Sequence, residues 1–524
     1  MSPLSDELNR SFQTTYQLIF GRESKHSLEG LQDYMLQYHY PTSRRASALS
    51  GKTVAIAAER YAPNARFISQ DEIDFSKKGA PLSINDIKDI DSLYFTLSER
   101  FYYAGNKMFG NTQEAEYSDN CTDSFKVENS HSVVQSKNVA YSSYVRDASE
   151  HVFGSGVFIR SKFLIKVLGA ADLVRSFETY FSTNNSDLFF CFFCHGCAHT
   201  MFSFNQRSKR YCIGNRELPK DQYFALRAKL VAEAADYIDQ HQKFYSIFDY
   251  APPASGAMAG LSAPQKAPLP FSLSPMDDAF KLTTKLVLGK EFGPLSKFEK
   301  FLSHHVASVQ SASSPFGNEV PYSEYFWARH APKTRLINQE EAYVLGQQVL
   351  QCDERTALSD LARRMSSIAF YCADFNEGDN VNFALTPTRY FCADVYHIAD
   401  ATYTKKSAYC THATRCEAVF GCGILITNCK FCIRCHDCMD CTASMDLDSC
   451  KSCSNSMFCH NCENLENCMF CFNTKSLRYA IGNVEVGREK FMQIKQMVQA
   501  ELVRQLEKEG DIKLDVCALG GRGR

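Results

Sequence analysis

The sequence predicts an α+β fold made of two related halves, each with a helical head, a parallel β-solenoid and a closing amphipathic helix. Two observations lead to this prediction. In a stretch of 43 residues all cysteines are separated from one another by multiples of three positions. Several motifs also return about 268 residues later in the chain. A short repeat period of this kind is typical of stacked coils that bury a continuous column of side chains.

The cysteine-rich stretch of the second half keeps a single register from Cys429 to Cys471. Its intervening positions are mostly polar, as expected when one set of side chains faces inward and the other faces water. An 18-residue period sorts the inward set into columns of small or apolar residues, one of which is Cys432, Cys450 and Cys468. We therefore predict buried, stacked columns. The residues predicted to be structural in this stretch are Cys432, Cys435, Cys441, Cys450 and Cys453.

The chain is predicted to be an internal duplication. FNQRSKRYCIGN at 204–215 returns as FNTKSLRYAIGN at 472–483, and an earlier motif beginning at Arg60 returns at Arg329. Each closing turn then leads into a helix with one apolar face, spaced by three and four residues. The structural residues predicted at these turns are Tyr211, Gly214, Asn215, Tyr479, Gly482 and Asn483.

These matches divide the chain into two units and a linker. The first unit is residues 1–250, and the second is residues 276–510. The segment 251–275 is rich in Pro, Ala and Ser and is expected to be a linker, and 511–524 is a tail. The solenoids are predicted at about 115–215 and 370–483, and the capping helices at about 219–242 and 487–509. A terminal helix would cover strand edges that could otherwise aggregate.

Composition narrows the class of protein. The net charge of -2 gives no electrostatic footprint for nucleic acid, because 57 Lys and Arg balance 59 Asp and Glu. The sequence shows no signal peptide and no apolar stretch long enough to span a membrane, so we expect a cytoplasmic protein or one built into a particle assembled there. The 23 cysteines are an odd number in a large chain, which favours reduced thiols over disulfides.

Zinc is the main chemical alternative to a purely structural role for the thiols. Cys459, Cys462, Cys468 and Cys471 form two Cys-x2-Cys pairs, and four thiolates suit tetrahedral zinc. The five residues between the pairs are fewer than in most zinc ribbons. In the first half, Thr200 and Ser203 stand opposite Cys468 and Cys471, a replacement that core packing tolerates more easily than metal ligation does. No cofactor is therefore required, and zinc stays the alternative.

Other chemistries fit less well. The spacing from Cys429 to Cys438 resembles the start of a ferredoxin motif, but the third gap is too short and the period continues to Cys441. In Cys194-His195 and Cys435-His436, neighbouring residues of a strand point to opposite faces, so no nucleophile-base pair is assigned. The tandem His304-His305 is expected on a partly exposed helix surface. No phosphate loop or dinucleotide fingerprint occurs.

The closing segment CMFCFNTKSLRYAIGN resembles a pattern found in uncharacterised cysteine-rich repeat proteins of environmental bacterial and phage genomes. The stretch from 185 to 223 matches that pattern more fully. Thr200 and Ser203 depart from the denser Cys-x2-Cys spacing of those proteins. The resemblance implies a shared repeat fold and carries no known activity.

We therefore expect a non-enzymatic scaffold or assembly protein, such as a component of a phage-like particle. Its expected partners are other protein subunits, including copies of itself, and neither membrane nor nucleic acid. A zinc-stabilised protein-binding module is the second hypothesis, and an iron-sulfur electron carrier is the third. Solenoids suit a scaffold because they offer long, flat sides.

Overall fold

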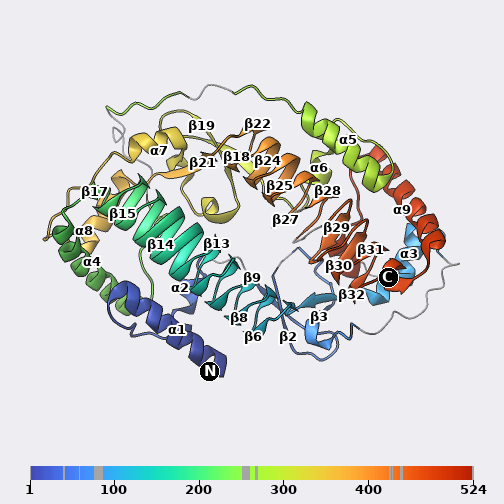
Figure 1. The fold of residues 1–524 in the computed structure, drawn as a ribbon, viewed down its shortest axis with the longest axis horizontal. Helices are drawn as coiled ribbons and strands as arrows, with labels where there is room; N and C mark the ends of the chain where they lie inside the picture. The colour runs from blue at the N-terminus through green and yellow to red at the C-terminus, as the bar shows by residue number, and fades with distance from the viewer. Residues whose placement is uncertain are drawn as a thin grey trace.

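The computed structural model confirms a mixed α+β fold in which most strands are parallel. It describes residues 2–38, 42–57, 60–75, 87–250, 260–265, 269–423, 426–427, 429–436 and 441–521. Two large, curled parallel sheets, one in each half of the chain, dominate the molecule (Figure 1). Parts of the expected linker, 251–259 and 266–268, and Cys438 lie outside the described residues.

The sheet of the first half, called the first sheet here, contains 13 described strands. Its bounds are β5 (Met108–Phe109), β6 (Gln113–Glu116), β7 (Asp119–Thr122), β8 (Phe125–Glu128), β9 (His131–Val134), β10 (Lys137–Ala140), β11 (Ser143–Arg146), β12 (Glu150–Phe153), β13 (Gly156–Ile159), β14 (Lys162–His195), β15 (Ala198–Arg207), β16 (Arg210–Ile213) and β17 (Arg216–Glu217).

The sheet of the second half, called the second sheet here, contains 15 described strands. Its bounds are β20 (Leu336–Asn338), β21 (Tyr371–Glu377), β22 (Val381–Ala384), β23 (Thr388–Tyr390), β24 (Ala393–Thr402), β25 (Lys405–Thr414), β26 (Glu417–Phe420), β27 (Ile426–Thr427), β28 (Lys430–Ile433), β29 (Met445–Asp448), β30 (Met457–Glu463), β31 (Glu466–Met469), β32 (Phe472–Lys475), β33 (Arg478–Ile481) and β34 (Val484–Glu485).

Each turn of both sheets is about 12 residues long. Asp119 pairs with His131, and Met445 pairs with Met457, so a residue lies beside the one 12 positions later. The 18-residue period inferred from the sequence is therefore wrong. Residues 18 apart, such as Cys450 and Cys468, lie one and a half turns apart and do not share a column.

Every third residue points into the turn. In the first sheet these inward residues include Val127, Val133 and Val139, all fully buried. The residue before each inward position has a positive φ, such as Asn129 at 46° and Asn138 at 55°. Asn tolerates this left-handed backbone better than most residues. Because the chain bends at every third residue, a 12-residue turn has four short sides with one inward side chain each.

The helices lie along and at the ends of these sheets. Their bounds are α1 (Pro3–Phe20), α2 (Gln32–Leu36), α3 (Ile90–Leu97), α4 (Lys220–His241), α5 (Ser274–Leu288), α6 (Glu299–Leu302), α7 (Gln339–Leu345), α8 (Leu358–Arg364) and α9 (Arg488–Glu509). Figure 1 shows α1 and α4 against the first sheet, and α5 and α9 against the second. Helices α4 and α9 contact the last turns of their sheets, at β16 and β33.

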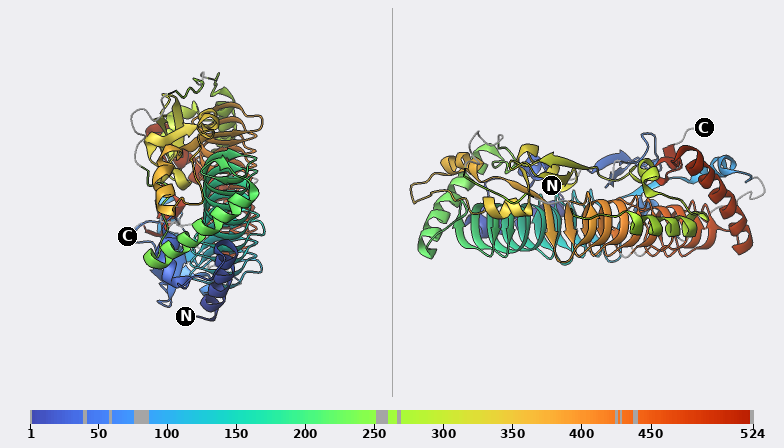
Figure 2. Two further views of the ribbon diagram at one scale, coloured as in Figure 1. Left: turned by 90° about the vertical axis from the view of Figure 1, so that its left-hand side faces the viewer. Right: turned by 90° about the horizontal axis from the view of Figure 1, so that it is seen from above.

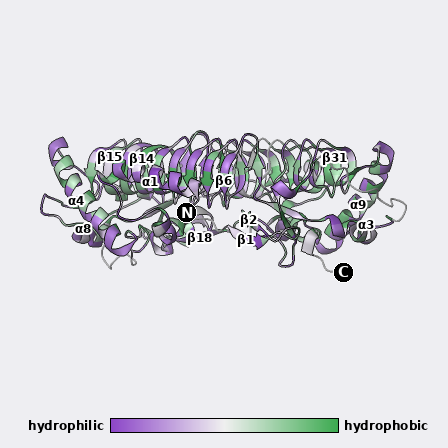
Figure 3. Cartoon of the chain, turned by 90° about the horizontal axis from the view of Figure 1, so that it is seen from below, coloured by the Kyte–Doolittle hydropathy of each residue, from purple (hydrophilic) through white to green (hydrophobic). Residues whose placement is uncertain are grey.

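The apolar faces predicted for the two closing helices are confirmed. In α4 the buried residues include Tyr223, Leu226 and Leu230, and in α9 they include Phe491 and Ile494. In Figure 3 hydrophilic and hydrophobic residues alternate along both helices, as expected for elements with one buried face. Each closing helix therefore covers the end of a sheet with a packed apolar stripe.

Short segments between the first helices and the large sheets form the middle parts of the two heads. In the first half they include β1 (Ser43–Ala46), β2 (Thr53–Ile56), β3 (Phe67–Ser69) and β4 (Tyr103–Gly105). In the second half they include β18 (Val309–Ser313), β19 (Glu319–Ser323), β20 and β21. In both sheets the turns are stacked one after another along the long axis of the molecule, and the short segments lie beside the stacks (Figure 2).

The middle segments of the heads are exchanged between the halves, whereas α1 and α5 pack against the sheet of their own half. Tyr103, from the first half, belongs to the same hydrophobic core as the second sheet, whereas Tyr371, from the second half, belongs to the core of the first sheet. The Tyr103 hydroxyl donates a hydrogen bond to the Val516 carbonyl, and the Tyr371 hydroxyl donates one to the Ile247 carbonyl, both at 2.7 Å. Each core is therefore completed by residues of the other half.

Candidate functional site

The thiols form the interior of the sheets. Every described cysteine is buried and free of disulfide bonds, as the sequence pattern predicted. In the second sheet the Cys450 thiol donates to two backbone carbonyls, those of Asp448 at 3.3 Å and Cys459 at 3.4 Å. Serines of the first sheet make similar contacts, because the Ser124 hydroxyl donates to the carbonyls of Thr122 and Val133. Thiol and hydroxyl can thus fill equivalent inward positions.

The four cysteines of the candidate zinc set do not share one column. Cys459 and Cys471 are one turn apart, whereas Cys462 and Cys468 lie on other sides of the turn. Burial raises the pKa of the Cys459 thiol to about 11 and that of Cys462 to about 12. A raised pKa favours the neutral thiol over the thiolate that zinc binds. Among the described residues, no group of three or more Cys, His, Asp or Glu could hold a metal ion.

The closing turns match between the halves. Gly214 has a φ of 59° and Gly482 a φ of 55°, so both glycines adopt the same left-handed conformation. The following asparagines fix the turn. The side-chain Oδ1 atom of Asn215 accepts from the Phe204 backbone amide at 2.8 Å, and Oδ1 of Asn483 accepts from the Phe472 backbone amide at 2.9 Å. Their side chains replace a missing next strand as acceptors.

The tyrosines of the closing turns also match. The Tyr211 ring lies 5.7 Å from the ring of Tyr223, and the Tyr479 ring lies 5.9 Å from that of Phe491, measured between centroids. Tyr223 and Phe491 lie near the starts of α4 and α9. These contacts join each last turn to its closing helix.

The paired histidines lie elsewhere than expected. His304 and His305 follow α6 rather than lying on a helix, and His305 is largely buried. The His305 ring contacts the Asp515 carboxylate and packs edge-on against His436 at a centroid distance of 4.4 Å. The expected helix was wrong because α6 ends at Leu302. His304 is exposed, as expected, and both histidines contact aspartates of the tail.

A junction of buried ionisable residues lies beside each sheet, where other residues of the same half pack against it. At the first of these junctions, the Lys166 ammonium donates to the Tyr34 carbonyl at 2.9 Å and lies 4.1 Å from the Tyr38 ring centroid. Burial lowers the pKa of Lys166 to about 8, and the nearby Glu178 carboxylate opposes the shift. Glu178 accepts hydrogen bonds from the hydroxyls of Tyr34 and Tyr180. The Lys166 ammonium is therefore stabilised by carbonyl oxygens and by the faces of aromatic rings.

The second junction has the same plan with different residues. Arg434 and Asp446 are fully buried, with their Nε and Oδ1 atoms 3.6 Å apart, and Arg434 donates to Asp515 at 2.7 Å. Burial raises the pKa of Asp446 well above its usual range, and Arg434 opposes this shift. Removal of Arg434 would therefore leave a buried acid without its cation.

A histidine connects the exchanged head to this second junction. The His460 Nε2 atom accepts a hydrogen bond from the Ala104 amide at 2.9 Å, and its Nδ1 atom lies 2.8 Å from the Asp448 carboxylate. An accepting Nε2 requires Nδ1 to carry the proton, so the ring is neutral here. Burial also lowers the pKa of His460, which favours the same form. Tyr61 of the exchanged head donates to Asp448 at 2.7 Å.

The two junctions were not found from the sequence, although a signal exists. Lys166 and Arg434 are 268 residues apart, as are Glu178 and Asp446, so one basic and one acidic residue recur at the spacing of the duplication. Within each pair the acidic residue follows 12 positions later, on the next turn. A search for charged residues at inward or covered positions in both halves would have pointed to them.

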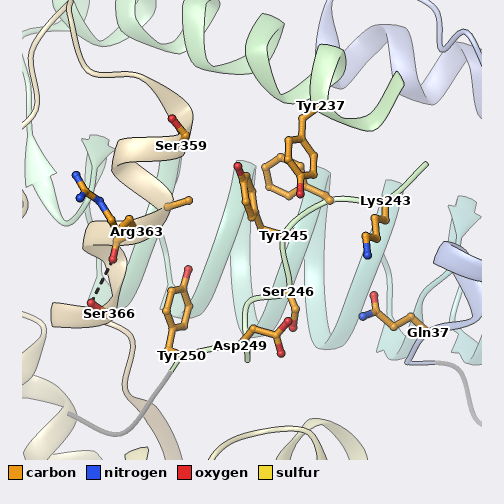
Figure 4. A pocket seen from close by; sticks show the side chains of 12 residues that line it. Gln37, Tyr237, Lys243, Tyr245, Ser246, Asp249, Tyr250, Ser359, Arg363 and Ser366 are labelled. Atoms are coloured by element: carbon orange, nitrogen blue, oxygen red, sulfur yellow. Dashed lines mark hydrogen bonds between the residues drawn. The ribbon is translucent and has the colours of Figure 1, made fainter. Parts of the chain in front are cut away.

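A pocket of about 520 Å³ lies beside the first junction. Its residues come from α4 and the segment that follows it, from Gln37 at the end of α2, and from α8 and the turn after it in the second half (Figure 4). The pocket connects to the junction through two shared residues. The Gln37 side-chain oxygen accepts from Lys166 at 3.4 Å, and the Ser246 hydroxyl is 2.7 Å from that of Tyr38.

The rings of Tyr237, Phe244, Tyr245 and Tyr250 line this pocket, and the buried Lys166 and Tyr38 lie behind it. None of the described helices is long and apolar enough to cross a membrane. Comparisons with protein-family models, curated proteins and solved structures found no match for this chain.

Proposed function

We propose that this chain is a non-enzymatic scaffold subunit built from a duplicated β-solenoid. The observation that carries the proposal is the filling of both sheets. Inward positions are buried at every turn, and thiols and hydroxyls there bond to backbone carbonyls of their own and neighbouring turns. An interior packed in this way is rigid and leaves the thiols to act as core side chains.

The reciprocal contacts support the duplication. Asn205 donates to the Phe370 carbonyl at 3.1 Å, and Asn473 donates to the Tyr102 carbonyl at 2.7 Å. In both cases an asparagine of one half holds the head of the other, and donors and acceptors are each 268 residues apart. We infer that the two units share one fold and are related by a pseudo-twofold exchange.

The outer faces offer surfaces for assembly. Successive turns carry opposite charges at the 12-residue spacing, such as Arg160 with Asp172 and Arg175 with Asp187, whose guanidinium and carboxylate groups lie 2.7–2.8 Å apart. Such ladders keep the sides regular and polar. We propose that other protein subunits, including copies of this chain, dock on these sides, in the cytoplasm or in a phage-like particle.

The ends of the sheets are less suited to assembly than their sides. Helices α4 and α9 contact the last turns, and β4 of the first head contacts β30 and β32 of the second sheet. Covered ends disfavour open-ended stacking of strands. We therefore expect closed oligomers or side-by-side arrays rather than fibres.

Sedimentation of the purified chain across a wide concentration range, combined with electron microscopy, tests this proposal. We expect a discrete oligomer or an ordered array that weakens with salt, because its contacts are polar. The variant Arg175→Glu should weaken assembly, whereas Lys513→Glu, on an exposed residue of the tail, is the matched control. A monomer at every concentration, with enzymatic turnover or tightly bound metal, would contradict the scaffold.

A further inference from the structure

The pocket beside the first junction has aromatic walls of fixed geometry. The rings of Tyr237 and Tyr245 are stacked, with centroids 4.4 Å apart and planes 27° apart. Buried Phe244 packs against Tyr245 at 5.3 Å, so the rings are held from behind. Tyr250 lies on the other side of Tyr245 and lines the same pocket (Figure 4). Rigid rings of this kind offer a flat apolar surface to a ligand.

The charges at the pocket are balanced. Lys243 and Asp249 both line it, both are exposed, and neither forms an ion pair with another described residue. The third charged residue at the rim, Arg363, is held by the carboxylate of Asp360. A ligand with a net charge would be repelled by either Lys243 or Asp249. The pocket therefore favours a ligand without net charge.

Hydrogen-bonding groups are also available around the rings. In the described part of the chain, the hydroxyls of Tyr237, Tyr245 and Tyr250 make no hydrogen bond. Gln37 and Ser246, in contrast, are oriented by Lys166 and Tyr38 of the junction. The pocket therefore offers both donors and acceptors, two of which are held in place from behind.

We propose that this pocket binds a neutral saccharide. A pyranose ring has an apolar C–H face that can lie on a tyrosine ring, and its hydroxyls donate and accept at its edge. About 520 Å³ is enough for one or two such rings. A phosphate ligand would need more than the single available cation of Lys243. A quaternary ammonium would meet that same cation, although aromatic cages otherwise suit it.

The test is a binding titration of the full-length protein by calorimetry and saturation-transfer NMR. The saccharide probes are methyl glucoside, maltose, galactose and N-acetylglucosamine. Choline, inorganic phosphate and adenosine monophosphate are the comparison probes. We expect at least one saccharide to bind, and the comparison probes to bind at least about tenfold more weakly, the equivalent of about 1.4 kcal/mol.

Three variants locate the site. Tyr245→Ala should raise the Kd of the best saccharide by about tenfold, whereas Tyr245→Phe keeps the ring and should change it by about threefold or less. Tyr343→Ala removes another exposed tyrosine, on α7 outside the pocket, and should leave the Kd unchanged. The melting temperature of each variant shows that it is folded.

Several results would overturn the proposal. They are no binding of any saccharide probe, tighter binding of phosphate or choline, or saccharide binding that Tyr245→Ala does not weaken. The scaffold proposal and the saccharide proposal can fail independently. The sedimentation test measures assembly, whereas the titration measures ligand binding by a pocket that assembly does not require.

Discussion

Single residues decide how the interior of each sheet is filled. Cys, Ser, Val and Leu all occupy inward positions, because each is small or apolar enough for one short side of a turn. The three-residue spacing of the cysteines predicted which residues are buried. It could not predict the number of sides per turn, because both 12 and 18 are multiples of three and give equally apolar columns.

Replacement of one inward thiol should have a small effect. Cys468→Ala removes a sulfur atom that contacts the carbonyls of Glu466 and Leu477 in a buried position. We expect the free energy of unfolding to fall by about 1–2 kcal/mol in chemical denaturation. Complete loss of the folded second half in this variant would instead indicate that Cys468 is a metal ligand.

Removal of one buried charge should have a large effect. Arg434→Met leaves the carboxylates of Asp446 and Asp515 buried without their guanidinium partner, and the free energy of unfolding should fall by about 3–5 kcal/mol. Arg478→Met breaks an exposed pair with Glu466 at the same 12-residue spacing and should cost less than about 1 kcal/mol. Equal costs in urea denaturation would show that the buried junction is not a special site.

Among the elements, the closing helices followed most directly from the sequence. Their apolar residues recur at spacings of three and four, and α4 begins at Lys220 and α9 at Arg488, each within one residue of the expected start. The short strands of the heads were not predicted, because segments of three to five residues have too few positions for a clear alternation. Their pairing depends on contacts with the other half.

The glycine of the second closing turn gives a test of this packing. A Cβ atom added to Gly482 would lie 2.2 Å from Leu97 of the exchanged head, at a φ of 55°. Gly482→Ala should therefore lower the free energy of unfolding by about 2–4 kcal/mol, from backbone strain and overpacking together. Gly487 also has a positive φ but no atom within 4 Å of such a Cβ, so Gly487→Ala should show only the strain, about 1 kcal/mol. Equal effects on the melting temperature would refute the contact with Leu97.

At the scale of the whole molecule, the sequence predicted a duplication but not the exchange of the middle segments of the heads. Repeated motifs such as those at Arg60 and Arg329 indicate that two segments are related. They do not show which sheet each segment packs against, because both sheets offer similar apolar faces. The same ambiguity hid the pocket, whose walls come from both halves and meet only after the exchange.

The many buried thiols predict that the protein loses stability in alkali. Burial raises the pKa of Cys450 and Cys471 above the ordinary value of 9.0. This stabilisation is fully present below pH 9.0 and is lost as the pH rises toward the folded-state pKa, because the unfolded chain then releases protons that the folded chain keeps. Each such thiol should cost about 1.4 kcal/mol per pH unit above its unfolded-state pKa.

Denaturant titrations from about pH 8 to about pH 10 measure this loss. The hydrogen bond with the Cys450 thiol, together with burial, raises the pKa of Cys453. Cys453→Ser therefore removes one titrating group and should reduce the pH dependence by one proton. A midpoint that is flat over this range, or a slope that the variant leaves unchanged, would mean that the thiols are not buried in neutral form.

The metal content of the natively purified protein, measured with and without a chelator, tests the central claim that the thiol columns are a packed core. We expect less than one equivalent of any metal per chain and a melting temperature that a zinc chelator does not change. One or more equivalents of zinc, with collapse of the second half on chelation while the cysteine-poor first half stays folded, would contradict it. That result would assign zinc to Cys459, Cys462, Cys468 and Cys471 and make the chain a zinc-stabilised module.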